Sequence, residues 1–438
     1  MQGLLHPDGV YDDPHGGILR SGLYRRLRVH FQFRNELPLF QEVNHNVNPF
    51  SVNVYAAERA SVGFRHISSL FHPSTVDTSI EHDGAGVCGG IKDDSGSWNT
   101  NGHQSRVIEI DEPTLGLFAQ LYDHQASQSL EARLPVLHSR ELLHVLRRFS
   151  EHPRRLSDLK GRYTSSEMWN ETQAVVDGTI IREPRFPMHS REWILSGPHI
   201  APGNPISKTP RRVCTDKSHY DTVDLTLIPA DYHSRTNYLP ACDPVTYLGR
   251  MPLVSWDPQV PVSSFYRLAY RGMLSQPRER TLIAAIIPPN SGHIHGTQST
   301  AFADSRNLLS AAFVAASLIA DLFIKTTGRN NLHYSWEPFP HLDLDPRMAV
   351  LVLMLNCLNE HYSDLWRDCW QDDFVSARWS KRDPRLDNVH FASLTPDWCW
   401  ATPLRTDYER RQSLLEIDVL AVHHRRGKVS MVAPRTND

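Results

Sequence analysis

The sequence predicts a mixed α/β fold whose middle part is rich in strands and whose C-terminal part is helical. Residues 50–55 (FSVNVY) alternate apolar and polar side chains, which is the period of a strand. Residues 114–122 and 140–149 carry apolar side chains at helical spacing. Between residues 304 and 328 the helical pattern is apolar on almost every side, which is typical of a buried helix.

The remaining elements are predicted from the same two periodicities. A buried strand at 282–289 is stopped by two prolines, which cannot donate to a β-ladder. Residues 83–103 are a glycine-rich loop. Strands are also expected at 3–6, 29–33 and 107–110, and helices at 21–28, 346–362 and 407–422.

Length and composition are those of an ordinary globular protein. The chain has 438 residues, of which 40% are hydrophobic and 22% charged, so two or three domains with well-filled cores are expected. Its 30 prolines and 23 glycines predict many irregular connections. The formal net charge is −3, so a basic surface for nucleic acid would have to be local.

Cysteine usage and hydropathy predict a cytoplasmic protein. The six cysteines are scattered and none forms a C-x-x-C pair, which speaks against a zinc site and favours reduced thiols. The N-terminus lacks the basic and apolar regions of an export signal. The longest apolar run, 308–324, contains Asp321 and is short for a membrane span, so no membrane association is expected.

Two sequence patterns resemble nucleotide or methyltransferase motifs, but their contexts favour simpler structures. The G-x-G-x-x-G pattern at residues 84–89 neither follows a predicted strand nor opens a predicted helix, so we interpret it as a loop. Residues 48–50 (NPF) lack the second proline of an Asn-Pro-Pro-aromatic motif and lead directly into a strand. His293 and His295 have no companions at metal-ligand spacing. We therefore predict no metal site and no catalytic residue.

Basic residues interleaved with aromatic and amide side chains suggest a surface for DNA. Arginine can make two parallel hydrogen bonds to phosphate or to guanine, and asparagine can do the same for adenine. On composition alone, solvated arginine faces are the common alternative. The basic residues concerned are Lys208, Arg211 and Arg212 on a proline-bounded loop, Arg235, and Arg278 and Arg280 on either side of one acid.

Five segments resemble a known family in their sequence and in their order. They look like the C-terminal part of large N6-adenine DNA methyltransferases of restriction–modification and phage-defence systems, including the DISARM type. Residues 3–13 (GLLHPDGVYDD) and 47–55 (VNPFSVNVY) also resemble the last strands of that family's catalytic domain. The resemblance covers nearly the whole chain. The five segments are 193–205, 220–225, 228–241, 280–289 and 408–421.

The resemblance implies an organisation and a set of DNA contacts. The family transfers a methyl group from S-adenosylmethionine to adenine N6 in duplex DNA, and its C-terminal part recognises the target. His233 and Ser234 depart from the Leu-Pro expected before residues 235–238. The implied regions are a truncated Rossmann-like methyltransferase sheet (1–60), a loop-rich α/β connecting region (61–160), an α+β target-recognition region (161–300) and a helical C-terminal part (301–438). The implied DNA contacts are His199, Lys208, Arg211, Arg212, Arg235, Asn237, Tyr238, Arg278 and Arg280.

The resemblance also implies what this chain does not contribute. The family's Phe-x-Gly-x-Gly cofactor loop and its Asn-Pro-Pro-aromatic motif would both precede Gly3, and neither occurs in these residues. We therefore expect a chain that binds double-stranded DNA, holds no cofactor itself, and depends on a separate catalytic chain for methyl transfer. A sheet that begins at its fifth strand is expected to leave an open edge. The alternatives are a complete but divergent methyltransferase that uses residues 48–50 and 84–89, and a fragment with no independent role.

Overall fold

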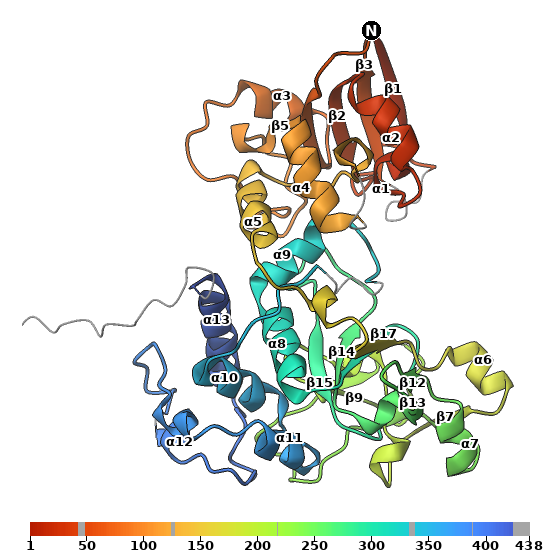
Figure 1. Ribbon diagram of the computed structural model, residues 1–438, viewed down its shortest axis with the longest axis vertical. Helices are drawn as coiled ribbons and strands as arrows, with labels where there is room; N and C mark the ends of the chain where they lie inside the picture. Colours follow the sequence, from red (N-terminus) through yellow and green to blue (C-terminus); the bar gives the residue numbers. More distant parts are fainter. Residues whose placement is uncertain (43–48, 124–127, 217, 333–337, 388, 424–438) are drawn as a thin grey trace, which may run out of the picture. The chain divides into compact units, whose positions relative to one another are not determined.

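Figure 1 shows the computed structural model of the chain, which describes residues 1–42, 49–123, 128–216, 218–332, 338–387 and 389–423. The chain forms two compact units. The chain first crosses from one unit to the other between Pro153 and Arg154. The first unit consists of Met1–Pro153, Gln276–Glu279 and Phe323–Arg329, and the second of Arg154–Ser275, Arg280–Leu322 and Asn330–Asp438.

The first unit is built on a five-stranded sheet. Its strands are β1 (Gln2–Pro7), β2 (Leu27–Phe33), β3 (Phe50–Tyr55), β4 (Gly63–Leu70) and β5 (Ile108–Asp111). Their order is β1-β3-β2-β4-β5, in which β2 and β4 run parallel and the other neighbours antiparallel. The strands expected at 3–6, 29–33, 50–55 and 107–110 are thereby confirmed.

β1 lies at the edge of this sheet. Among the described residues its strand neighbour is β3 alone. Leu4 and Leu5 on β1 are 49% and 56% exposed. The unpaired backbone groups of such an edge can accept another strand.

The helices of the first unit are α1 (Gly9–Asp12), α2 (Gly17–Tyr24), α3 (Ser74–Glu81), α4 (Glu112–Tyr122) and α5 (Arg140–Ser150). α4 and α5 confirm the helices expected at 114–122 and 140–149. The position expected for the helix at 21–28 is wrong, because β2 already begins at Leu27. Tyr24 ends α2 inside the core, where its ring stacks on Phe64 and its hydroxyl donates to the carbonyl of Ala132 at 2.5 Å.

Over its described residues, the second unit contains a four-stranded antiparallel sheet of order β15-β14-β17-β6 and four two-stranded pairs. β15 (Ala284–Ile287) confirms the strand expected at 282–289 and ends directly before the two prolines. The other strands of the sheet are β6 (Tyr163–Ser166), β14 (Arg267–Arg271) and β17 (Thr297–Phe302). The pairs are β7 (Ile180–Arg185) with β11 (Thr236–Pro240), β8 (Ile194–Leu195) with β16 (Gly292–His293), β9 (Lys208–Pro210) with β10 (Tyr220–Thr222), and β12 (Leu253–Val254) with β13 (Asp257–Pro261).

The helix expected between residues 304 and 328 is wrong as a single element. It is divided at Ser317 into α8 (Ser305–Ala316) and α9 (Leu318–Thr326), which are bent by 70°. The Ser317 hydroxyl donates to the Val314 carbonyl at 2.7 Å, and Asp418 accepts the Leu318 N–H at 2.7 Å. These contacts stabilise an extended residue in the middle of an otherwise helical pattern.

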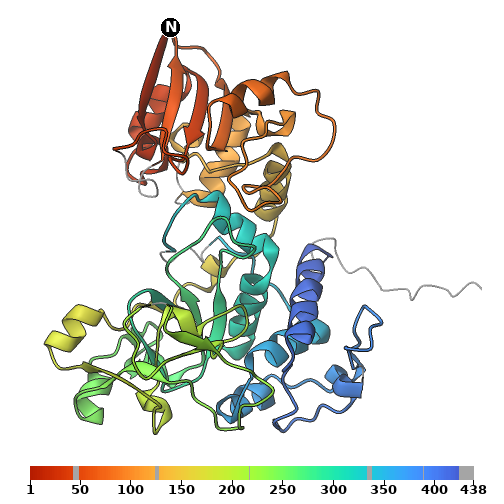
Figure 2. The same ribbon diagram turned by 180° about the vertical axis from the view of Figure 1, so that it is seen from behind.

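The remaining helices are α6 (Glu171–Val176), α7 (Pro244–Gly249), α10 (Pro346–Asn356), α11 (Ser363–Asp368), α12 (Val389–Ala392) and α13 (Asp407–His423). α13 confirms the helix expected at 407–422, and α10 ends six residues before the predicted end at 362. α8, α10 and α13 pack against one another, as both views show (Figures 1 and 2). In the described part of the chain, no helix is by itself both long and apolar enough to cross a membrane, whereas α8 and α9 taken together pass that test despite their bend.

Candidate nucleic-acid interface

Seven of the nine residues expected to contact DNA lie together in the second unit, around β9, β10 and β11. The backbone N–H of Arg235 donates to the Thr209 hydroxyl at 2.9 Å, which fixes the start of β11 against β9. The seven differ in exposure. Lys208, Arg211, Arg212 and Arg235 are at least partly exposed, whereas His199, Asn237 and Tyr238 are buried.

The β9–β10 hairpin presents three of the cations. Lys208 lies in β9 opposite Thr222, and Arg211 and Arg212 follow the strand as exposed residues. Arg211 forms an exposed ion pair with Asp221 at 2.9 Å, which is a weak interaction in water. In the described part of the chain, the side chains of Lys208 and Arg212 have no such partner. These two cations are therefore available to an external anion.

Arg235 connects the hairpin with the loop that follows β7. Its Nη1 donates to the Pro210 carbonyl at 3.1 Å, and its guanidinium carbon lies 4.5 Å from the centre of the Phe186 ring. Stacking on an aromatic ring holds a guanidinium in one plane while leaving its other N–H groups free. Arg235 is thus a preoriented donor at the surface.

Two further arginines of this surface are absent from the DNA contacts that were expected from the sequence. Arg182 donates to the Cys214 carbonyl at 2.7 Å, and Arg185 lies 3.3 Å from Glu183 and 3.5 Å from Glu192. Both arginines lie on β7, which pairs with β11. In the sequence, Arg182 and Arg185 stand among acidic residues. No local sequence pattern predicts the pairing of β7 with β11, which brings these arginines beside Arg235.

His199 is fully buried, and its imidazole already uses both nitrogens. Nε2 donates to the carbonyl of Arg235 at 2.8 Å, and Nδ1 accepts the Ser196 N–H at 3.0 Å. Burial lowers the pKa of His199, so the ring is neutral near pH 7. This placement does not fit a direct DNA contact. His199 instead positions the backbone at the start of β11.

Asn237 and Tyr238 are also supporting residues rather than exposed contacts. The Tyr220 hydroxyl lies 2.9 Å from the Ser196 hydroxyl and accepts the amide of Asn237 at 2.7 Å. Asn237 is only 8% exposed and Tyr238 only 9%. Burial raises the pKa of Tyr238 to about 12. The hydroxyl of Tyr220 thereby joins the loop, the hairpin and β11 beneath the cationic surface.

The residues that depart from the family pattern pack inward. Ser234 accepts the indole N–H of the fully buried Trp193 at 3.1 Å. The His233 ring meets Trp193 edge to face at 5.1 Å and lies 4.2 Å from the His361 ring. Burial and the neighbouring His361 lower the pKa of His233 to about 4. His233 and Ser234 therefore hold the turn before Arg235 against the buried ring of Trp193.

Replacing Tyr220 by phenylalanine is expected to lower the free energy of unfolding by about 1–3 kcal/mol, because the buried amide of Asn237 loses its acceptor. Denaturant unfolding of Tyr220→Phe, Ser196→Ala and the double variant measures this effect and its coupling. A coupling free energy of zero between the Tyr220 and Ser196 hydroxyls would contradict the hydrogen-bond network of Ser196, Tyr220 and Asn237.

Arg278 and Arg280 do not join this surface. Arg278 is exposed in a segment of the first unit, where its carbonyl accepts a hydrogen bond from Lys325 at 2.9 Å. Arg280 is 8% exposed and donates to Asp418 at 2.7 Å and to the Ala316 carbonyl at 2.5 Å. Its burial and pairing do not fit a DNA contact and give it a structural role between α8 and α13.

The sequence pattern at residues 48–50 leads into a strand, and the pattern at residues 84–89 lies in a loop. Asn48 lies outside the described residues, the Pro49 carbonyl accepts the Asp8 N–H at 2.9 Å, and Phe50 begins β3. Residues 84–89 follow helix α3 and are irregular, as predicted. Over the described ranges, no three His, Cys, Asp or Glu side chains are arranged to hold a metal ion.

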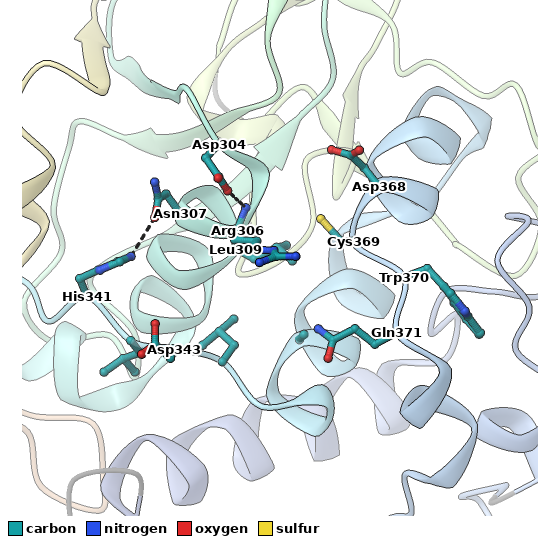
Figure 3. A pocket seen from close by; sticks show the side chains of 13 residues that line it. Asp304, Arg306, Asn307, Leu309, His341, Asp343, Asp368, Cys369, Trp370 and Gln371 are labelled. Carbon is teal, nitrogen blue, oxygen red and sulfur yellow. Dashed lines mark hydrogen bonds between the residues drawn. The ribbon is translucent and has the colours of Figure 1, made fainter.

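A cavity of ≈ 520 Å³ lies elsewhere in the second unit, at the start of α8. Figure 3 shows Asp304, Asp343 and Asp368 around it, with Arg306 between them. Asp343 pairs with Arg154 at 2.5 Å. Three carboxylates around one lining arginine disfavour the approach of a DNA phosphate. The cationic surface near β9 is therefore the better candidate for DNA.

Comparisons with known proteins add little to this geometry. No family model and no curated protein matches the chain. Among solved structures, the chain is similar to the type IIG restriction endonuclease BpuSI, with 11% identity and a TM-score of 0.30 over 96% of this chain and 47% of that one. The chain thus spans about half the length of that enzyme. At this TM-score the two do not share an established fold.

Proposed function

We propose that this chain is the DNA-recognition portion of an adenine-N6 DNA methyltransferase of a restriction–modification or phage-defence system. The observation that carries the proposal is the preorganised cationic surface of Lys208, Arg212 and Arg235. Its base is fixed by the buried side chain of His199 and the partly buried side chain of Tyr220. The ordered resemblance of five segments to that family supports the same function.

The exposed cations suit the two kinds of contact that DNA recognition needs. Lys208 and Arg212 are free to pair with backbone phosphates, which position a protein on the duplex. The planar guanidinium groups of Arg212 and Arg235 are also suited to the N7 and O6 atoms of guanine. Because the whole chain carries a formal charge of −3, attraction to DNA must come from this local surface.

Methyl transfer is proposed to require a separate chain that carries the S-adenosylmethionine site and the Asn-Pro-Pro-aromatic motif. The glycine loop at 84–89 does not fit this cofactor, because it follows a helix instead of a buried strand and does not open a helix. A side chain at Gly89 would also meet the Asn99 amide at 2.6 Å, so this glycine makes room for the protein's own packing.

The purified chain alone is expected to bind duplex DNA with an affinity that falls steeply as salt rises from about 50 to 200 mM, because bound phosphates release their counterions. Fluorescence anisotropy of a labelled duplex measures this. The same sample is expected to transfer no radiolabel from S-adenosylmethionine to DNA. Absence of binding at low salt would overturn the DNA-recognition function, and methyl transfer by the chain alone would favour the complete enzyme instead.

A further inference from the structure

The loop after β7 exposes apolar side chains next to the candidate interface. Its sequence from 185 to 191 is RFPMHSR, with an arginine at each end. Phe186 is 50% exposed and Met188 75%, and Pro187 lies between them. Large apolar side chains gathered at a loop tip indicate a contact surface.

Internal hydrogen bonds hold the tip of this loop in place. The Glu192 carboxylate accepts the Met188 N–H at 2.8 Å and a hydrogen bond from Arg185 at 3.5 Å. Trp193 is fully buried directly after Glu192. The guanidinium of Arg235 also lies over the Phe186 ring. The apolar tip is therefore held at both ends and does not need to be ordered by its partner.

The tip of this loop, residues 186–188, forms a ridge at the rim of a hollow, and a second hollow begins at His189. One hollow has a volume of ≈ 590 Å³ and the other ≈ 410 Å³, and His189 and Ser190 line both. The larger hollow is also lined by Phe186, Pro187, Met188, Asp231, Tyr232, His233 and His361. Phe186, Pro187 and Met188 line the larger hollow alone, so the apolar tip borders open space on that side.

The charges around the ridge indicate the chemistry of the partner. Arg235 belongs both to the ridge, through Phe186, and to the cationic surface, through Pro210. Arg191 is exposed at the other end of the loop. Arginines beside an apolar tip suit a duplex, because phosphates pair with the cations while the apolar side chains enter between bases.

We propose that the ridge of residues 186–188 is a wedge that inserts Phe186 and Met188 into the base stack of the bound duplex. This inference rests on the proposed function and specifies how the DNA is deformed. Lys208 and Arg212 hold the phosphates, and the wedge separates a base step and unwinds it locally. The distortion allows a rigid loop to reach base edges that lie inside a regular duplex.

A plasmid topology assay tests the wedge without knowledge of the recognised sequence. A relaxed plasmid is incubated with the chain and a topoisomerase, and the topoisomers are separated after removal of protein. The wild type is expected to shift the linking number, because each inserted wedge unwinds the duplex. Phe186→Ala also removes the ring under the Arg235 guanidinium. Phe186→Ala/Met188→Ala is therefore compared at a protein concentration that saturates a labelled duplex in anisotropy, where it is expected to lose this shift.

The matched control is Met273→Ala, which removes a methionine side chain that is equally exposed, at 76%. It is expected to shift the linking number as the wild type does. Binding by the wild type without any shift would overturn the wedge and leave DNA recognition standing. A shift retained by the double variant would also overturn it. Failure of the wild type to bind DNA would overturn both proposals.

Discussion

Replacing Arg410 by methionine is expected to lower the free energy of unfolding of the second unit by about 3–5 kcal/mol. Arg410 is 7% exposed on α13. Its guanidinium donates to the carbonyl groups of Gly203, Leu355 and Leu404, each at 3.0 Å. Methionine fills most of the same space but leaves three buried acceptors without donors, which is where the cost arises.

Tryptophan fluorescence in a denaturant titration measures this loss. Trp98 is the one tryptophan of the sequence within the first unit, so the fluorescence change reports mainly on unfolding of the second unit. The matched control is Arg411→Met on the next, exposed position of the same helix, with an expected change below about 1 kcal/mol. Equal effects of the two substitutions would contradict the role given to Arg410. That role links residues 193–205 with residues 408–421, two of the segments that resemble the methyltransferase family.

Lowering the pH from 7.5 to 5 is expected to destabilise the second unit. Burial, together with the charge of Arg267, lowers the pKa of the buried His293 to about 3. In the unfolded chain a histidine titrates near its ordinary value of about 6.5, so below that pH the unfolded state takes up a proton that the folded state refuses. Stability is therefore full above pH ~6.5 and is lost as the pH falls toward 3. At pH 5 the loss from His293 alone is about 2 kcal/mol.

Denaturant midpoints across this pH range test the prediction. His293→Gln is expected to reduce the slope of stability against pH by about 1.4 kcal/mol per pH unit below pH 6, because one titrating group is removed. The buried His199 acts in the same direction and leaves part of the slope in place. A wild-type stability that stays constant between pH 7.5 and 5 would contradict the neutral, buried state of these rings.

Local periodicity predicted most strands and helices but not which of their faces are buried. Residues 50–55 form β3, yet Ser51 and Asn53 are its buried side chains and Val52 is only partly covered. The polar side chains face inward because Asn53 accepts the Tyr11 hydroxyl at 3.1 Å and donates to Ser51 at 2.9 Å. An alternating strand is usually interpreted as burying its apolar face, and here a buried hydrogen-bond network makes the polar face the buried one. The members of this network come from separate elements, so the sequence of the strand alone does not predict it.

The same limit applies to the candidate interface. Arg212 and Arg280 look alike in the sequence, but Arg280 is buried by a pair with Asp418, which lies 138 residues away. Asp418 also accepts the N–H of Leu318, the first residue of α9. His199 is likewise buried, and its Nε2 donates to the carbonyl of Arg235, which lies 36 residues away in the sequence. Sequence clusters of basic residues outline the candidate interface, whereas burial decides which of them are exposed there.

The most direct test of the account is the salt dependence of duplex binding by Lys208→Ala/Arg212→Ala/Arg235→Ala. Each removed phosphate contact is expected to lower the slope of log affinity against log salt by about 1, so the triple variant should bind weakly and with a much flatter slope than the wild type. Arg382→Ala, which removes an exposed arginine from the segment between residues 377 and 388, should leave both quantities unchanged. If the triple variant instead binds as tightly as the wild type with the same slope, the cationic surface beside β9 is not where this chain meets DNA.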